Sequence, residues 1–401
     1  MAKKQKNKKT KNSKYIALTL AVAALVVNFW AWSLLSPLGT VYANEFSLSS
    51  IQLSLLLAVP VLVGSLGRII FGIITDKIGG RRAFTLICLV CAVPVFGLMM
   101  ANTYHQLLLI AFLLGVGGAA FVVGIPFVGA WFPPERRGLV LGIYSMGNAG
   151  TALSGFATPR LADYLGRDIT FLIVGLLLVF MAVLFLIIGQ NAPGWKPPKT
   201  SSLSSLKKAM KFQVTWDLSA VYIITFGAFV AFGVYLPVLL KTTYNLSLTD
   251  AATKAAGFVL LATIARPVGG WLSDKIGGRL VIKASLLGVI ILACFVAFQS
   301  TLGVKATIVY LSLAFILGCS NGAVFALVGR SVSADIMGSV TGVIGAVGGL
   351  GGFLPPLVLG LTYQKTHSYA PALIMLAISA FVVLVYVNWR FRDKVLYHRC
   401  I

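Results

Sequence analysis

The sequence has few charged residues and very few acidic ones. Charged residues make up 11% of the 401 positions, and only ten Asp and Glu accompany 33 Lys and Arg. Hydrophobic residues make up 58%, so the chain lacks the polar side chains that would cover a water-soluble globule of this size. Apolar runs of roughly 18 or more residues, long enough to cross a bilayer as helices, recur along nearly the whole chain. The composition predicts an all-α polytopic membrane protein.

Side chains suited to catalysis or to metal binding are also scarce. The three histidines lie in predicted loops or in the C-terminal tail, and four of the five cysteines lie inside apolar runs, where they are expected to be packing residues. Cys88 and Cys91 have CxxC spacing, but a redox or zinc site needs accessible thiolates and further ligands. The sequence has no GxSxG or HExxH motif and no paired intramembrane aspartates. We therefore expect no enzyme activity, no cofactor and no metal site.

Basic residues gather in the short segments between apolar runs and at the chain ends. The first fourteen residues hold seven lysines and no acid, which predicts a disordered cytoplasmic tail near anionic lipid and makes a nucleic-acid-binding arm the less favoured interpretation. With a cytoplasmic N-terminus, the loops rich in Lys and Arg all fall on one side of the bilayer. This pattern predicts a multi-pass protein of the cell membrane, inner or plasma, with both termini in the cytoplasm.

Twelve apolar segments are long enough to be membrane spans, and they fall into two groups of six. We expect spans at 15–36, 50–75, 83–101, 105–131, 138–160 and 169–190, and then at 216–240, 252–273, 280–300, 305–329, 337–362 and 369–389. Between the groups lies the only long polar stretch inside the chain, rich in Pro, Ser and Lys. The predicted organisation is a basic tail (1–14), a six-helix bundle (15–190), a cytoplasmic linker (191–215), a second bundle (216–390) and a second tail (391–401).

An internal repeat relates the two groups. Residues 68–81 read RIIFGIITDKIGGR and residues 266–279 read RPVGGWLSDKIGGR, and eight of the fourteen positions are identical. The identical residues are mainly Arg, Gly, Asp and Lys at fixed spacing, which chance similarity between apolar helices would not produce. The repeat predicts two halves with the same orientation in the membrane.

The repeated motif resembles the loops between spans 2 and 3 and between spans 8 and 9 in the major facilitator superfamily. The residues that carry the resemblance are Gly72, Asp76, Gly79 and Arg81, with counterparts Gly270, Asp274, Gly277 and Arg279. The resemblance covers the whole chain and implies that family's fold, in which two six-helix bundles rock around a central site. It also implies that Asp76 and Asp274 make gating contacts between helices that favour the outward-open state, although an ordinary charged helix end is the simpler interpretation.

Arg68 and Arg266 are the most informative residues of the sequence. Each lies eight positions before its loop aspartate, which is ~12 Å along a helix and close to the middle of the bilayer core. An Arg at that depth costs about 2.5–3.5 kcal/mol on insertion scales, so it is expected to face a cavity and to have a function. A guanidinium matches a planar oxyanion bidentately. The alternative is a buried ion pair, but none of the ten acids falls in the middle of a predicted span.

Glycine is abundant, with 41 residues, and two spans are especially rich in it. GVIGAVGGLGG at 342–352 contains Gly342, Gly345, Gly348, Gly349, Gly351 and Gly352, and GIYSMGNAG at 142–150 contains Gly142, Gly147 and Gly150. The simpler interpretation is close helix crossing through small residues. Alternatively, a smooth glycine surface lets helices slide and lets the backbone approach a very small substrate.

Together with the two arginines, these glycine runs resemble the signature of the nitrate/nitrite porter family. The match is closest in GAVGGLGGF, whereas Ser145 stands where family members often have Gly. The resemblance implies an anion held between two arginines and stacked by aromatic rings, with an asparagine nearby. The matching residues are Arg68, Arg266, Phe121, Asn148, Tyr222 and Phe226. From the residues alone the three aromatic side chains would more often be packing residues, whereas an Asn among glycines in lipid needs a hydrogen-bond partner.

The resemblance implies a secondary transporter of nitrate, nitrite or both that works by alternating access. Uptake of an anion against an inside-negative potential costs ~2.3 kcal/mol per 100 mV, so it needs coupling. We favour nitrate/nitrite exchange, because no Asp, Glu or His that could relay protons lies in a predicted pore. The alternatives are proton symport, a porter for another small anion such as an organic carboxylate or phosphate, or a membrane sensor without transport. One chain can form the pathway alone, which predicts a monomer.

Overall fold

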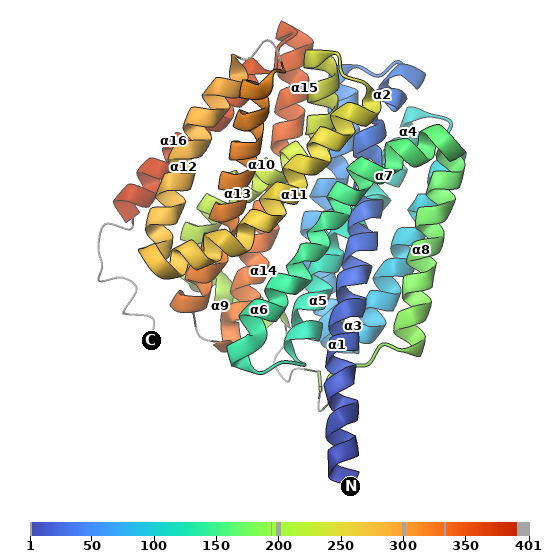
Figure 1. Cartoon of the computed structure of the whole chain (residues 1–401), viewed down its shortest axis with the longest axis vertical. Helices are drawn as coiled ribbons and strands as arrows, with labels where there is room; N and C mark the ends of the chain where they lie inside the picture. Colours follow the sequence, from blue (N-terminus) through green and yellow to red (C-terminus); the bar gives the residue numbers. More distant parts are fainter. Residues whose placement is uncertain (1, 194, 198–201, 299–301, 333, 391–401) are drawn as a thin grey trace.

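The protein is a bundle of helices that run mostly along one direction (Figure 1). The computed structural model describes residues 2–193, 195–197, 202–298, 302–332 and 334–390. Every regular element in these ranges is a helix, so the predicted all-α class is confirmed.

We call helices α1 to α8 the first half of the chain. They contain the first six predicted spans. The helices are α1 (Ala2–Trp32), α2 (Leu35–Glu45), α3 (Ser50–Gly97), α4 (Tyr104–Leu114), α5 (Ala120–Gly129), α6 (Pro134–Ser145), α7 (Ala149–Leu165) and α8 (Arg167–Ile187). Short 3-10 turns join several of them, namely η1 (Leu98–Met100), η2 (Gly115–Ala119) and η3 (Met146–Asn148).

We call helices α10 to α16 the second half of the chain. They contain the last six predicted spans. The helices are α10 (Gln213–Tyr244), α11 (Leu248–Leu272), α12 (Gly278–Ala297), α13 (Val304–Ser331), α14 (Ala334–Leu350), α15 (Leu354–Thr366) and α16 (Ala370–Arg390), with a π-helical turn η4 (Ser273–Gly277) before α12. The polar stretch between the halves contains one further helix, α9 (Ser202–Lys211).

Nine helical segments of the described chain are long and apolar enough to cross a membrane, and two of them are long enough to cross it twice. Ser50–Met100 and Leu248–Ala297 have 51 and 50 residues, whereas about 20 residues suffice for one crossing. Each bends at a glycine with positive φ, Gly79 at 80° and Gly277 at 91°, a conformation that side-chain-bearing residues rarely adopt. Each therefore forms two passes joined by a tight turn. With the pass formed by α6, η3 and α7, the helices accommodate all twelve predicted spans.

The N-terminal lysines continue the first helix. Helix α1 begins at Ala2, so the structure describes a helix over the segment for which the sequence predicted a disordered tail. Lys is a good helix former, and extending an existing helix avoids the cost of nucleating a new one. In Figure 1 this part of α1 projects from the bundle at the end where α9 lies, and α2, α4 and α15 lie at the opposite end.

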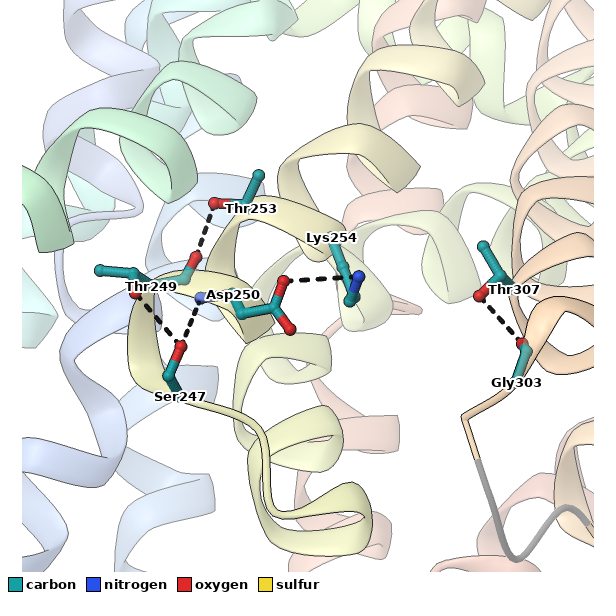
Figure 2. A network of polar contacts seen from close by, with 7 residues as sticks. All are labelled: Ser247, Thr249, Asp250, Thr253, Lys254, Gly303 and Thr307. Atoms are coloured by element: carbon teal, nitrogen blue, oxygen red, sulfur yellow. Dashed lines mark hydrogen bonds and ion pairs between the residues drawn. The ribbon is translucent and has the colours of Figure 1, made fainter.

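Local signals in the sequence set several helix ends. Helix α3 starts with a capping box between Ser49 and Gln52, and α11 starts after Ser247, whose hydroxyl accepts a hydrogen bond from the backbone N–H of Asp250 (3.1 Å). Figure 2 shows this cap and the Asp250–Lys254 ion pair one turn further on (3.4 Å). Such caps fix where each helix begins and so the height of the residues it carries.

Contacts between the halves determine what can lie between them. Helix α3 packs against α14 and α15, α7 packs against α11, and α2 packs against α10. Near α2, Ser54 donates a hydrogen bond to the hydroxyl of Tyr235 (3.1 Å), and Lys241 donates one to Thr40 (3.1 Å). The helices that carry Arg68 and Arg266, α3 and α11, therefore each contact the opposite half.

Candidate functional site

Both arginine side chains lie inside the bundle, as the sequence predicted. Arg68 on α3 is 7% exposed, and its Nη1 donates a hydrogen bond to the carbonyl oxygen of Gly345 on α14 (2.6 Å). Its Nε is buried and has no hydrogen-bond partner among the residues that the structure describes. Arg266 on α11 has two such atoms, Nε and Nη2. Because unpaired donors in a low dielectric are unfavourable, this arrangement is suited to a ligand that supplies acceptors.

One aromatic ring connects the two guanidinium groups. The Cζ atoms of Arg68 and of Arg266 each lie 5.5 Å from the centroid of the Phe226 ring on α10. Arg68 also lies 5.9 Å from the Phe121 ring, and Arg266 lies 4.7 Å from the Phe229 ring. These distances fall in the range of cation–π interactions, which help to hold the cationic groups in place. The structure thus brings together four of the predicted site residues and adds Phe229.

Tyr222 belongs to the same aromatic wall. Its ring stacks on Phe226 with centroids 4.6 Å apart and planes 2° from parallel, because residues four apart share a helix face. Phe325 on α13 meets the Tyr222 ring edge to face at 5.1 Å. The result is a flat aromatic surface beside two cationic groups.

The glycines of α14 allow the backbone to approach this surface closely. A Cβ atom at Gly348 would overlap the Tyr222 ring, and one at Gly349 would overlap the hydroxyl of Ser65 and lie 3.4 Å from Arg68 Nη1. Gly345 supplies the carbonyl that Arg68 contacts. Beyond them, Gly351 and Gly352 pack against Ile223 and Val230 of α10. A side chain at Gly348 would therefore displace the aromatic wall, and one at Gly351 would overlap the backbone of Ile223.

The glycines of the matching pass in the first half have different neighbours. Gly147 packs against Leu25, and Gly150 against the backbone of Val26, both on α1. A Cβ atom at Gly142 would meet nothing within 4 Å. Asn148 is 3% exposed, and its side-chain amide donates to the carbonyl of Ser145 in its own helical turn (2.6 Å). Within the part of the chain that the structure describes, no hydrogen bond joins Asn148 to either arginine.

Acidic side chains pair with basic ones at helix ends. The described ion pairs are Glu45 with Arg167, Asp250 with Lys254, Asp274 with Arg330, and Asp217 with Arg390. No described carboxylate lies within ion-pairing distance of Arg68 or Arg266. Over the described residues, the alternative of a buried ion pair is therefore not found at these two arginines. The site offers hydrogen-bond donors and positive charge, which suits a small anion.

Comparisons with known proteins establish the family. Residues 21–356 match the family described as the Major Facilitator Superfamily. The chain belongs to the Major Facilitator Superfamily. Among solved structures, a bacterial homolog of the human lysosomal transporter Spinster has a similar fold, with a TM-score of 0.75 at 18% identity, covering 96% of this chain and 97% of that one. This likeness confirms the fold class expected from the repeat.

Curated relatives within the superfamily cover nearly the whole chain. A protein of Mycobacterium tuberculosis named probable nitrate/nitrite transporter NarK2 is 44% identical over 94% of this chain and 97% of its own length. The nitrite extrusion protein of Bacillus subtilis is 36% identical over 96% and 97%, and the probable nitrate transporter NarT of Staphylococcus carnosus is 36% identical over 94% and 96%. These relatives confirm the resemblance to the nitrate/nitrite porter branch of the superfamily.

The two copies of the superfamily loop motif make different contacts. After the bend at Gly79, Arg81 donates through Nε to the carbonyl of Phe185 (3.2 Å) and through Nη2 to that of Leu186, at the end of α8. Asn191 accepts from the backbone N–H of Arg81 (3.0 Å).

In the second copy, Asp274 accepts a hydrogen bond from Arg330 on α13 (2.5 Å) in an exposed ion pair. The other motif residues lie on the helices around these bends. Gly72 packs against Val122, and a Cβ atom added at Gly270 would lie 4.0 Å from the carbonyl oxygen of Gly322. Asp76 lines a small cavity with Asn191, and Arg279 lies in the first turn of α12.

Several residues near the arginines were missed by reading the sequence. Phe325 is the counterpart of Phe121, since NGAVF at 321–325 matches GGAAF at 117–121, and this second repeat could have identified it. Phe229 is one turn beyond Phe226 and has no such signal. Asn321, which stands where the first half has Gly117, is buried at 1% exposure. A polar residue at a repeat position otherwise occupied by glycine is a signal that the sequence contained.

Proposed function

We propose that this protein carries nitrate and nitrite across the cell membrane by alternating access and exchanges one for the other. The observation that carries the proposal is the pair of inward arginines, each with at least one buried nitrogen that has no acceptor among the described residues and neither with a described carboxylate in ion-pairing distance. A bound oxyanion would neutralise the charge and accept from these donors.

The shape of the site favours a small planar anion over a larger one. The Tyr222 and Phe226 rings form a flat wall, and α14 glycines such as Gly348 bring backbone against it. Few polar groups are left to bind the hydroxyls of an organic acid or the four oxygens of phosphate. The names of the relatives point the same way, because they refer to nitrate, nitrite or both.

Exchange solves the energetic problem of moving an anion into a negative interior. Nitrate entering while nitrite leaves moves no net charge, whereas unaccompanied nitrate uptake costs ~2.3 kcal/mol per 100 mV. An empty site would leave two guanidinium groups without counter-charge during rocking, which disfavours return of the unloaded carrier. Both effects favour obligatory exchange over proton symport.

The proposal includes how the protein sits in the cell. We infer a monomer, because one chain supplies both arginines and the aromatic wall. We also infer that the end bearing α9, with its lysines Lys207, Lys208 and Lys211, faces the cytoplasm together with both termini, as the distribution of positive charge favours.

Flux in reconstituted vesicles tests the proposal. Purified protein is inserted into liposomes loaded with nitrite, with nitrate, or with neither, and uptake of ¹⁵N- or ¹³N-labelled nitrate is followed with and without a pH gradient. We expect uptake only into vesicles that contain nitrite or nitrate, with no dependence on the pH gradient.

Other outcomes separate the alternatives. Nitrate uptake into anion-free vesicles that rises with an inward proton gradient would replace exchange by proton symport. If neither nitrate nor nitrite is carried under any loading, the substrate assignment is wrong, and phosphate or a small carboxylate tested in the same vesicles becomes the leading candidate.

A further inference from the structure

Asn321 is a buried amide on a helix that packs against the Arg266 helix, and the function proposed above does not use it. It lies on α13, and its Oδ1 accepts a hydrogen bond from the hydroxyl of Thr225 on α10 (2.9 Å). The Nδ2 of the same amide is buried and has no partner among the described residues. Burying an amide N–H without an acceptor is unfavourable. An unpartnered amide nitrogen in this position is therefore explained if a bound ligand supplies the acceptor.

Asn321 has neighbours on the helices that form the anion site. Thr225, which holds its oxygen, directly precedes Phe226, the ring shared by both guanidinium groups. The next residue, Gly322, lies against the backbone carbonyl of Arg266, where any Cβ atom would overlap it. One turn further along α13, Phe325 meets the Tyr222 ring. Asn321 is thus bracketed by the helices that carry Arg266 and the aromatic wall.

The orientation of the amide follows from its anchor. The Thr225 hydroxyl lies closer to Asn321 Oδ1 (2.9 Å) than to the Val221 carbonyl (3.2 Å), and it donates to the amide oxygen. With the oxygen held, the NH₂ group must point away from Thr225. The unpartnered side-chain atoms of Arg68, Arg266 and Asn321 are then all N–H donors.

The number of donors distinguishes the two candidate anions. The unpartnered Nε–H and Nη2–H groups of Arg266 lie on one edge of its guanidinium and form a bidentate pair for two oxygens of a planar oxyanion, which accounts for all the oxygens of nitrite. Nitrate has a third oxygen, and without a further donor that oxygen would be desolvated and unpaired.

We propose that Asn321 donates an Nδ2–H to the third oxygen of nitrate and so sets the preference for nitrate over nitrite. This inference rests on the proposed function and adds a specificity-determining residue to it. Thr225 is a positioning residue, because it acts only by holding the amide oxygen. The bound ligand class is a planar trigonal oxyanion; a bent, two-oxygen anion leaves the amide unused.

The test measures nitrate and nitrite side by side. Wild-type protein and the variants Asn321→Leu and Thr225→Val are reconstituted, and the half-saturating concentration and maximal rate are determined for each anion by counterflow. Asn321→Leu keeps the side-chain volume and removes the donor. We expect the half-saturating nitrate concentration to rise roughly 10- to 100-fold, the range for one hydrogen bond to a charged group, while that for nitrite changes by less than about 2-fold.

Matched variants separate specificity from damage to the fold. Ser320→Ala removes the neighbouring buried hydroxyl, which also has no described partner, and should leave the nitrate-to-nitrite ratio unchanged. Thr225→Val is isosteric and should lower the nitrate preference in the same direction by a smaller factor. If Asn321→Leu fails to purify as a folded protein, the nitrate-to-nitrite ratio of half-saturating concentrations measured for Thr225→Val decides whether the inference holds.

The outcomes distinguish the inference from the function on which it rests. An unchanged nitrate-to-nitrite ratio in Asn321→Leu and Thr225→Val, with wild-type protein carrying both anions, overturns the role of Asn321 and leaves the transport function in place. Equal losses for both anions also overturn it, because they indicate a structural role. Wild-type protein that carries neither anion overturns both.

Discussion

Arg68 and Arg266 occupy equivalent positions of the sequence repeat but have different neighbours. Arg68 reaches across to the opposite half and donates to Gly345, which leaves one buried nitrogen without a partner. Arg266 has two unpartnered nitrogens and lies against two rings of α10. The repeat determines the depth of each arginine, whereas the helix that faces it determines its partners. Glycine-rich α14 lies against Arg68, and no described carbonyl accepts from Arg266 in the same way.

The largest expected effect tests this difference directly. Replacing Arg266 by Lys should lower the nitrate transport rate by about 100-fold or more, since a point charge cannot replace a planar donor with two unpartnered N–H groups, and hydrogen bonds to charged groups contribute about 1.5–3 kcal/mol each. Arg68→Lys should lower it less, roughly 10- to 100-fold, because one Arg68 donor is already used by Gly345. Uptake by vesicles with matched protein content measures both.

Arg167→Lys is the control for these variants. Arg167 pairs with Glu45 at a helix end, so the same substitution there should leave the nitrate transport rate near that of the wild type. Wild-type flux in Arg68→Lys or Arg266→Lys would refute the anion site. A larger loss in Arg68→Lys than in Arg266→Lys would reverse the proposed asymmetry between the halves.

A smaller effect is expected from the glycine runs, which also differ between the halves. In Gly348→Ala, the added methyl group overlaps the Tyr222 ring, and overpacking of this kind costs about 1–3 kcal/mol. Gly142→Ala places its methyl group where nothing lies within 4 Å, so stability and transport should stay unchanged. Thermal unfolding of the purified proteins and nitrate uptake would be measured together. Equal behaviour of the two variants would show that the two glycine runs have similar roles.

The smallest effect is expected at the loop motifs. Asp274→Asn removes an ion pair whose side chains are 64% and 51% exposed, and exposed pairs contribute at most about 1 kcal/mol. Thermal stability should fall only slightly, and the difference from wild type should shrink in high salt. Arg81→Ala in the first copy should destabilise more, because it removes hydrogen bonds to two backbone carbonyls of α8. A large, salt-independent loss in Asp274→Asn would contradict this ranking.

The sequence predicted the parts of the site that depend on spacing along one helix. The spacing from each arginine to its loop aspartate placed Arg68 and Arg266 inside a helix rather than at its end, and four-residue spacing predicted the shared face on which Tyr222 stacks on Phe226. Hydropathy alone identified the passes, although it did not indicate that pairs of them form helical segments continuous through the bends at Gly79 and Gly277.

Contacts between distant helices were beyond the sequence. The acceptor of Arg68 is a backbone carbonyl on α14, and backbone carbonyls have no signature in the sequence. Asn148 looked like a group that would line the site, but its amide is satisfied within its own helical turn. Asn321 has the unpartnered amide instead, and only the packing of α13 against α10 and α11 reveals it.

The hydrogen bond from Arg68 to Gly345 links substrate affinity to the packing of the two halves. On the proposed function, an anion that draws the Arg68 guanidinium toward itself pulls Nη1 away from the Gly345 carbonyl. Binding then weakens a contact between the halves, and by reciprocity a stronger contact weakens binding. One side chain shared by substrate and interface would thus let the arrival of cargo lower the barrier to the movement that releases it.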